Sequence, residues 1–176
     1  MNRRDIFQIF AIILMIIPTV KSEEIIPISM NSQINTESLN NVADSSKIYL
    51  SLSNLGEPEI VKLDTVLTNH IMSKIIKLSL CNINVDKDLL VALLLKFNTK
   101  QLCSFKARNV NFELCTSIHL TEFTKEIEEL IIQDCTFQTH GYNVFERLYW
   151  PKLRRLIIIN SNIAKRDFRT KSLLVS

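Results

Sequence analysis

The side chains that could perform acid–base, nucleophilic or metal chemistry are few and widely spaced in this chain. The histidines are His70, His119 and His140, and the acidic side chains are most concentrated at Glu126, Glu128 and Glu129. Neither set forms an HExxH metal motif or a recognisable pair of catalytic carboxylates. We therefore interpret the acidic run as a solvent-exposed strand edge and expect no enzyme activity.

The sequence also gives only weak support for a metal-binding site. Cys115 and His119 are four residues apart and could share one face of a helix. A structural zinc site takes four ligands, so this pair alone does not define one, and packing or surface roles are favoured. We expect neither a metal nor another cofactor.

The glycine content excludes several ligand-binding motifs. The 176 residues include 2 glycines, Gly56 and Gly141. The phosphate-binding loop GxxxxGK[ST], the dinucleotide-binding GxGxxG turn and the GxSxG nucleophile elbow each need glycines at short spacing. No small-molecule substrate is therefore expected. The chain length and the hydrophobic content of 47% fit one folded domain.

Four cysteines, Cys81, Cys103, Cys115 and Cys135, could form disulfides in an oxidising environment. Four cysteines allow three complete pairings, and the spacing does not choose among them. No CxxC pair is present. Neither a zinc ribbon nor a thioredoxin-like redox site is therefore indicated.

The first 22 residues have the pattern of a secretory signal peptide. Arg3 and Arg4 precede an apolar run from Ile6 to Val20, and Val20-Lys21-Ser22 offers a cleavage site before Glu23. The apolar run is shorter than the roughly 20 residues that cross a bilayer. We predict a cleaved signal and a secreted protein. An uncleaved signal anchor that tethers the chain to a membrane, or a buried N-terminal helix, is the alternative.

A repeated pattern organises the part of the chain that must position any functional side chain. Four similar segments start at Ile75, Leu102, Ile127 and Leu153, separated by 27, 25 and 26 residues. Their first, fourth, sixth and eleventh places are all apolar. These places hold Ile75, Leu78, Leu80 and Val85; Leu102, Phe105, Ala107 and Phe112; Ile127, Leu130, Ile132 and Phe137; and Leu153, Leu156, Ile158 and Ile163. A fainter unit begins at Lys47.

This pattern resembles the leucine-rich repeat, LxxLxLxx[NC]xL, which has a period of about 20–29 residues. The resemblance implies an α/β solenoid of about four to five repeats, with parallel strands and helical or irregular returns. The ninth place departs from the family, because it holds Ile83, Val110, Cys135 and Ser161 and only Cys135 matches. We therefore expect packing to support the turn in the first two units.

The resemblance and the composition together divide the chain into three parts. The signal peptide at 1–22 is followed by a stretch at 23–46 that is polar and rich in Ser and Asn, which indicates a flexible terminus. The leucine-rich-repeat domain then occupies 47–176. Within it, helical spacing of apolar residues predicts return helices at 86–97 and from Ile60 to Met72.

Side chains between the inward-facing residues point to the opposite, concave face of the expected sheet, because strand side chains alternate. Ile131, Ile157 and Ile159 would form a contiguous apolar patch there, and such patches often mark protein interfaces. The candidate protein-binding residues on this face are Lys77, Ser79, Lys106, Arg108, Glu129, Ile131, Gln133, Arg155, Ile157 and Ile159.

We therefore predict noncatalytic binding of a protein partner, whose identity the sequence leaves open, through this strand face. One alternative is that the C-terminal segment covers the patch, or that these strands are buried on both faces. A second is binding of a polyanion (nucleic acid, anionic lipid or sulfated glycan) by the basic segment from Lys165 to Lys171 with Arg154 and Arg155. A third is an intracellular repeat adaptor similar to the repeat portion of F-box proteins.

Overall fold

The computed structural model describes residues 24–31, 39, 42–44, 46–97, 101–112, 124–137, 149–163 and 169–170. The expected signal peptide at 1–22 lies outside these ranges, as do Cys115, His119 and His140. Among the described helices, none combines the length and the apolar content that a membrane crossing requires.

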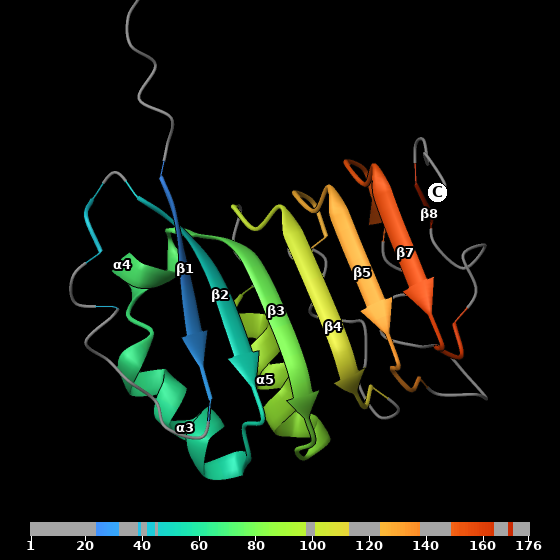
Figure 1. The fold of residues 1–176 in the computed structure, drawn as a ribbon, viewed down its shortest axis with the longest axis horizontal. Coiled ribbons are helices and arrows are strands. Elements are labelled where there is room, and N and C mark those ends of the chain that lie inside the picture. The colour runs from blue at the N-terminus through green and yellow to red at the C-terminus, as the bar shows by residue number, and fades with distance from the viewer. Residues whose placement is uncertain are drawn as a thin grey trace, which may run out of the picture.

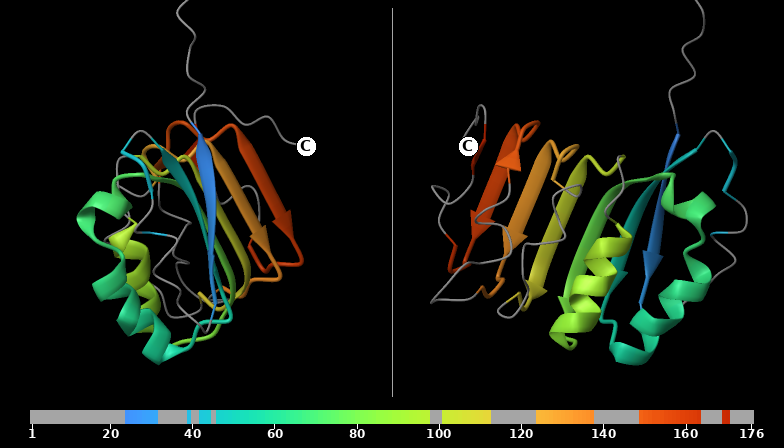
Figure 2. Two further views of the ribbon diagram at one scale, coloured as in Figure 1. Left: turned by 60° about the vertical axis from the view of Figure 1, so that its left-hand side comes forward. Right: turned by 180° about the vertical axis from the view of Figure 1, so that it is seen from behind.

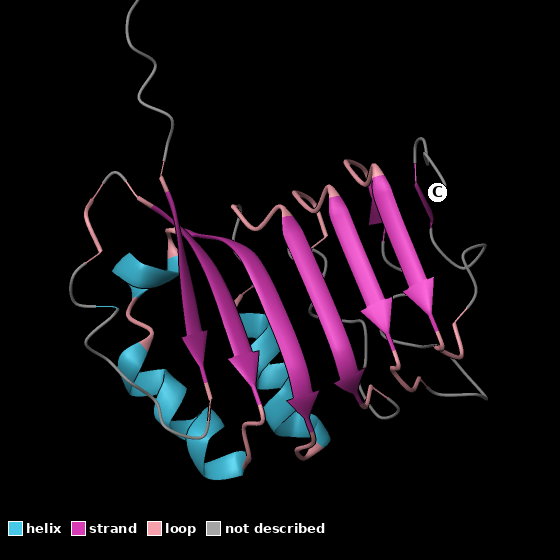
Figure 3. Ribbon diagram, in the orientation of Figure 1, coloured by secondary structure: helices cyan, strands magenta, loops and turns pink. Residues whose placement is uncertain are grey.

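The fold is α/β and is built on a parallel sheet of six strands in the order β1-β2-β3-β4-β5-β7. Figures 1 and 3 show these strands side by side and pointing the same way. They are β1 (Ile25–Met30), β2 (Lys47–Ser53), β3 (Ile75–Ile83), β4 (Ser104–Val110), β5 (Glu129–Gln133) and β7 (Arg155–Ile159). A separate two-stranded parallel sheet pairs β6 (Tyr149–Trp150) with β8 (Arg169–Thr170).

The strand register agrees with the alignment of the repeated segments. Leu78 of β3 pairs with Phe105, Phe105 with Leu130, and Leu130 with Leu156, so the fourth places of the four units are neighbours. Leu50 pairs with Leu78 and brings the fainter unit into the same register. The predicted parallel strands are therefore confirmed, together with the α/β class.

The three described helices are α3 (Glu57–Val66), α4 (Asn69–Met72) and α5 (Lys87–Lys96), and all lie against one face of the sheet (Figure 2). The helix predicted at 86–97 is α5, and its first turn is capped by the Asp86 carboxylate, which accepts a hydrogen bond of 2.8 Å from the Asp88 N–H. The expected single helix from Ile60 to Met72 is instead two, because Thr68 is extended and its hydroxyl caps α4.

The core lies between the sheet and the helices. The apolar side chains at the first, fourth, sixth and eleventh places are buried there, apart from Val85 and Ile158, which are partly buried against it. The rings of Phe112 and Phe137 from successive units stack with centroids 5.1 Å apart. Equivalent apolar places of successive segments are therefore buried in one common core.

The expectation of a flexible terminus at 23–46 does not hold for Ile25–Met30. These residues form β1, which pairs with β2 along its whole length and buries Ile28 and Met30. The strand was not predicted because its six residues are too few to show a clear sequence pattern, and the polar stretch that follows dominates the composition of 23–46. The sheet consequently begins one strand earlier than the repeat alignment indicated.

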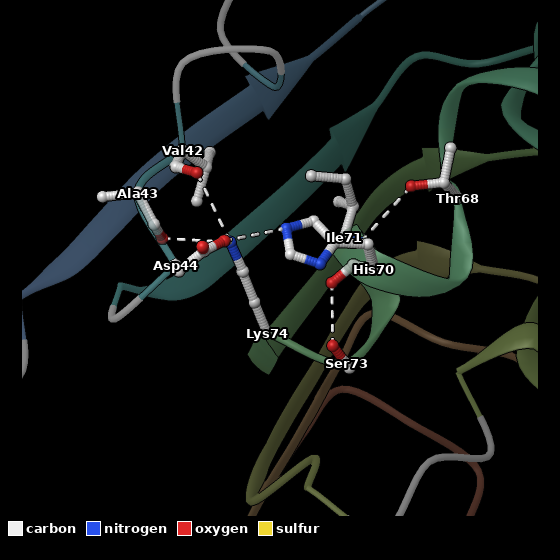
Figure 4. Close-up of polar contacts among 8 residues, drawn as sticks. All are labelled: Val42, Ala43, Asp44, Thr68, His70, Ile71, Ser73 and Lys74. Carbon is white, nitrogen blue, oxygen red and sulfur yellow. Dashed lines mark hydrogen bonds and ion pairs between the residues drawn. The ribbon is translucent and has the colours of Figure 1, made fainter.

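A buried lysine attaches the segment before β2 to the body of the fold (Figure 4). The Lys74 side chain is only 7% exposed, and its Nζ donates to the carbonyl oxygens of Val42 at 3.3 Å and Ala43 at 3.0 Å. The carboxylate of Asp44 lies 3.5 Å from the same Nζ and 3.4 Å from Nε2 of His70 on α4. The buried ammonium therefore has acceptors in place of water.

A second repeated feature lies where the strands end. The eighth place of every unit is Asn or Asp with a positive φ between 47° and 53°, at Asn54, Asn82, Asn109, Asp134 and Asn160. Asn and Asp adopt this left-handed conformation more readily than other residues that carry a Cβ. Their side chains also pair across the units: Asn82 Nδ2 donates to Asn54 Oδ1 at 2.8 Å, and Asn109 Nδ2 to Asn82 Oδ1 at 2.9 Å. The asparagines thus serve both the turn and the stacking of units.

Replacing Asn109 separates the contribution of its left-handed backbone conformation from that of its side-chain contact with Asn82. Asn109→Ala should lower the free energy of unfolding by about 1–2 kcal/mol, because Ala at a positive φ is strained and the contact with Asn82 is lost. Asn109→Gly should lower it by less than about 1 kcal/mol, because Gly accepts the conformation. Urea denaturation of both variants gives the comparison, and equal losses would contradict a role for the backbone conformation.

Candidate protein-binding face

The predicted site residues lie on the sheet face opposite the helices, which we call the outer face. None of the described helices lies on this side of the sheet (Figure 2). Along β2 and β5 the burial alternates strictly between a buried and a half-exposed residue. This alternation places the third, fifth and seventh places of the units on the outer face, as predicted. The predicted binding residue Ser79 is an exception in accessibility, because it is buried with 6% exposure and is not available to a partner.

The register arranges these residues in rows that cross the strands. The fifth places run in the order Ser29, Ser51, Ser79, Lys106, Ile131 and Ile157. The seventh places run Ser53, Cys81, Arg108, Gln133 and Ile159. The outer face therefore changes from small hydroxyl side chains on β1 and β2, through basic residues on β4, to aliphatic residues on β5 and β7.

Three isoleucines form the aliphatic end of this face. Ile131 and Ile157 are in-register neighbours and are half-buried, and Ile159 beside them is 42% exposed. We call Ile131, Ile157 and Ile159 the apolar patch. The alternative that these strands are buried on both faces is wrong, because their outer side chains remain accessible to solvent. The other alternative, that the C-terminal segment covers the patch, concerns a segment of which only Arg169 and Thr170 are described after Ile163.

The acidic run and the basic residues of the next unit form pairs across the strands. Arg155 Nη1 lies 2.6 Å from Glu129 Oε1, and the other oxygen of Glu129 accepts a hydrogen bond of 2.8 Å from the Ser104 hydroxyl. Arg154 lies 3.9 Å from Glu128, and Lys152 pairs with Glu126. The acidic run is therefore more than a solvated edge, and Arg154 and Arg155 already face carboxylates.

Most of the basic segment considered for polyanion binding lies outside the described residues. Of the range 165–171, the structure describes Arg169 and Thr170, which form β8. Lys77, Lys106 and Arg108 instead make a basic cluster on the outer face of β3 and β4. The sequence placed all three on this face but did not distinguish them from the paired Arg155.

Three of the four cysteines are described, and all three carry free thiols. Burial raises the pKa of the Cys103 thiol, and the positive charge of Lys77 only partly opposes this effect. Burial also raises the pKa of the Cys135 thiol, whose Sγ donates to the carbonyl of Gln133 at 3.2 Å.

The residues at the ninth place of each unit support the turn in two ways. Ile83 and Val110 are buried and support it by packing, as predicted. Cys135 and Ser161 each donate a hydrogen bond to the carbonyl oxygen two residues earlier.

A polar hollow of about 270 Å³ lies at the carboxyl ends of β3 to β5. Its lining includes Asn82, Asn84, Asn109, Asn111, Asp134 and Thr136. Sequence reasoning considered the ninth place of the repeat and missed this edge, although Asn or Asp at the eighth place of five units was a visible signal. The side chains here bond to one another, as in the contact of 3.0 Å from Thr136 Oγ1 to Asn111 Oδ1.

Comparison of the chain with protein-family models, curated proteins and solved structures finds no match. Within the described ranges, no three or more His, Cys, Asp or Glu side chains gather closely enough to hold a metal ion. The geometry of the outer face therefore carries the functional interpretation.

The raised thiol pKa values predict slow alkylation in the native state. At pH 8, iodoacetamide should modify Cys103 and Cys135 more slowly than in the denatured chain, because the thiolate is the nucleophile and burial disfavours it. Mass spectrometry of cysteine-containing peptides resolves each position, with the denatured protein as the control. Native rates equal to the denatured rates would show that these thiols are not protected.

Proposed function

We propose that this chain is a noncatalytic protein-binding protein of the leucine-rich-repeat type, and that the partner binds the outer face of the sheet. Support for a repeat solenoid comes from the in-register pairing of the aligned units and from their equivalent buried places. The shared Asn or Asp at the eighth place is further support, because stacked units need equivalent turns.

The apolar patch is the observation that favours a protein partner. The half-buried Ile131 and Ile157 and the exposed Ile159 form a contiguous surface on adjacent strands, and burying such a surface stabilises an interface. Polar and charged side chains border the patch at Gln133 and at the Glu129–Arg155 pair. An apolar centre with a polar rim is the usual composition of a protein interface.

The absence of catalysis and the secretion of the protein are proposed from the sequence alone. The first rests on the missing catalytic motifs, and the second on the signal-peptide pattern of residues 1–22. N-terminal sequencing of the protein purified from culture medium should begin at Glu23. A chain that begins at Met1 and stays with the cell would favour the membrane anchor or the intracellular adaptor.

The protein-binding proposal predicts that charge in the apolar patch removes the partner. The double variant Ile157→Glu, Ile159→Glu should reduce capture of the specific partner at least about tenfold, because two carboxylates would be desolvated in the interface. The measurement is quantitative mass spectrometry of extracellular proteins retained by the wild-type and variant proteins.

The control variant is Val61→Glu, which introduces a carboxylate at a residue of α3 that is 56% exposed and belongs to the helical side. It should retain the partner at the wild-type level. Circular dichroism must show the same fold for all three proteins. Equal retention by the double variant would exclude the apolar patch as the binding site.

A further inference from the structure

The basic cluster carries positive charge on the outer face that no carboxylate of the described residues pairs. Lys77 and Lys106 are half-buried and Arg108 is exposed, on the outer face of two adjacent strands. Within the described part of the chain, none of the three forms an ion pair, whereas Lys152, Arg154 and Arg155 each face a glutamate. The outer-face carboxylate of Glu129, on the adjacent strand β5, is already shared by Arg155 and Ser104.

The basic cluster and the apolar patch are continuous across the strands. Lys106 pairs in register with Ile131, and Ile131 with Ile157; Arg108 pairs with Gln133, and Gln133 with Ile159. Neighbouring strands are about 4.8 Å apart, so the backbone positions of Lys106 and Arg108 lie roughly 5–10 Å from an isoleucine on the same row. Lys77 lies on the adjoining row, which continues through Ser104 to Glu129. An extended chain advances about 3.3 Å per residue and covers this distance in two or three residues.

We propose that the partner presents an extended acidic–apolar peptide segment, which lies across the strands with Asp or Glu over the basic cluster and an aliphatic or aromatic residue over the apolar patch. The acidic and apolar residues are two or three positions apart. This inference rests on the proposed function and specifies the chemistry of the partner.

Charge complementarity selects the acidic residue, since a cation that forms no ion pair with the described residues is available to a carboxylate and sets the orientation of the partner. The adjoining isoleucines select a peptide over a sulfated glycan or a nucleic acid. A pure polyanion would neutralise the three cations but would leave the apolar patch exposed. Both halves of the surface are satisfied only by a segment that carries both kinds of side chain.

The test selects random twelve-residue peptides displayed on phage against the purified full chain. Enriched peptides should contain Asp or Glu two or three positions from an aliphatic or aromatic residue. A synthetic copy of the most enriched peptide should bind Lys106→Glu about tenfold more weakly than wild type, because attraction becomes repulsion. Lys62→Glu, the same charge reversal on an exposed residue of α3, should leave its affinity unchanged.

A charge exchange completes the test. The peptide in which Lys replaces the acidic residue should bind Lys106→Glu more tightly than it binds wild type, and added salt should weaken the original complex. Enrichment without acidic residues, or equal losses with Lys106→Glu and Lys62→Glu, would overturn the inference. So would tight binding of heparin or nucleic acid that is indifferent to the Ile157→Glu, Ile159→Glu variant.

These outcomes distinguish the inference of an acidic–apolar peptide from the proposal that the outer face binds a protein. Peptides whose binding is lost with Ile157→Glu, Ile159→Glu but not with Lys106→Glu would refute the acidic partner and keep the outer face as a protein-binding site. Peptides unaffected by both sets of changes would refute the outer face itself.

Discussion

Parallel, in-register pairing of successive strands is the constraint on which the rest of this structure depends. Each strand must be followed by a return that brings the chain back by one strand spacing, about 4.8 Å away. Equivalent apolar side chains of neighbouring strands lie in register and are buried, so neighbouring strands contribute to one shared core. Phe105 and Ala107 illustrate how the space in the core limits side-chain size. Both are fully buried. Phe105 is the largest side chain at any fourth place, and Ala107, in the same unit, is the smallest at any sixth place. Close-packed cores favour such compensation of volume.

The same repetition organises the polar ends of the strands. A turn that needs a left-handed residue occurs once in each unit, and Asn or Asp meets that need at a small conformational cost. Since equivalent positions stack, the carboxamides come close enough to bond to one another, as do Asn54, Asn82 and Asn109. Further along the edge, Phe137 N–H donates to Asn162 Oδ1 at 2.7 Å, and Asn162 Nδ2 donates to the Phe137 carbonyl at 2.7 Å. These contacts satisfy backbone groups that the ends of the strands leave unpaired.

The outer face is where the units differ most, because its side chains are not required to pack in the core. Its fifth places change from serine to lysine to isoleucine while the buried fourth places remain Leu or Phe. The proposed binding role uses this freedom: the core keeps the strands in register, and the register then fixes the distance between charge and apolar surface. Cross-strand pairs such as Glu129–Arg155 reduce the free charge on β5 and β7 and leave the basic cluster on β3 and β4 as the main electrostatic feature of the described outer face.

The amino-acid sequence by itself determined the positions of β2, β3, β4, β5 and β7, the helix at α5 and the residues that face each side of the sheet. It could do so because alternation with period two, helical spacing and a 25–27-residue repeat are carried by the chain locally and recur several times. The tertiary structure decided the features that involve residues of different units. It placed Ile25–Met30 in the sheet, divided the second predicted helix at Thr68, and paired Glu126, Glu128 and Glu129 with basic residues. It also separated Lys106, which forms no ion pair among the described residues, from the paired Arg155. The partner of a charge depends on which side chains the register brings within a few ångströms, and no local sequence pattern contains that distance.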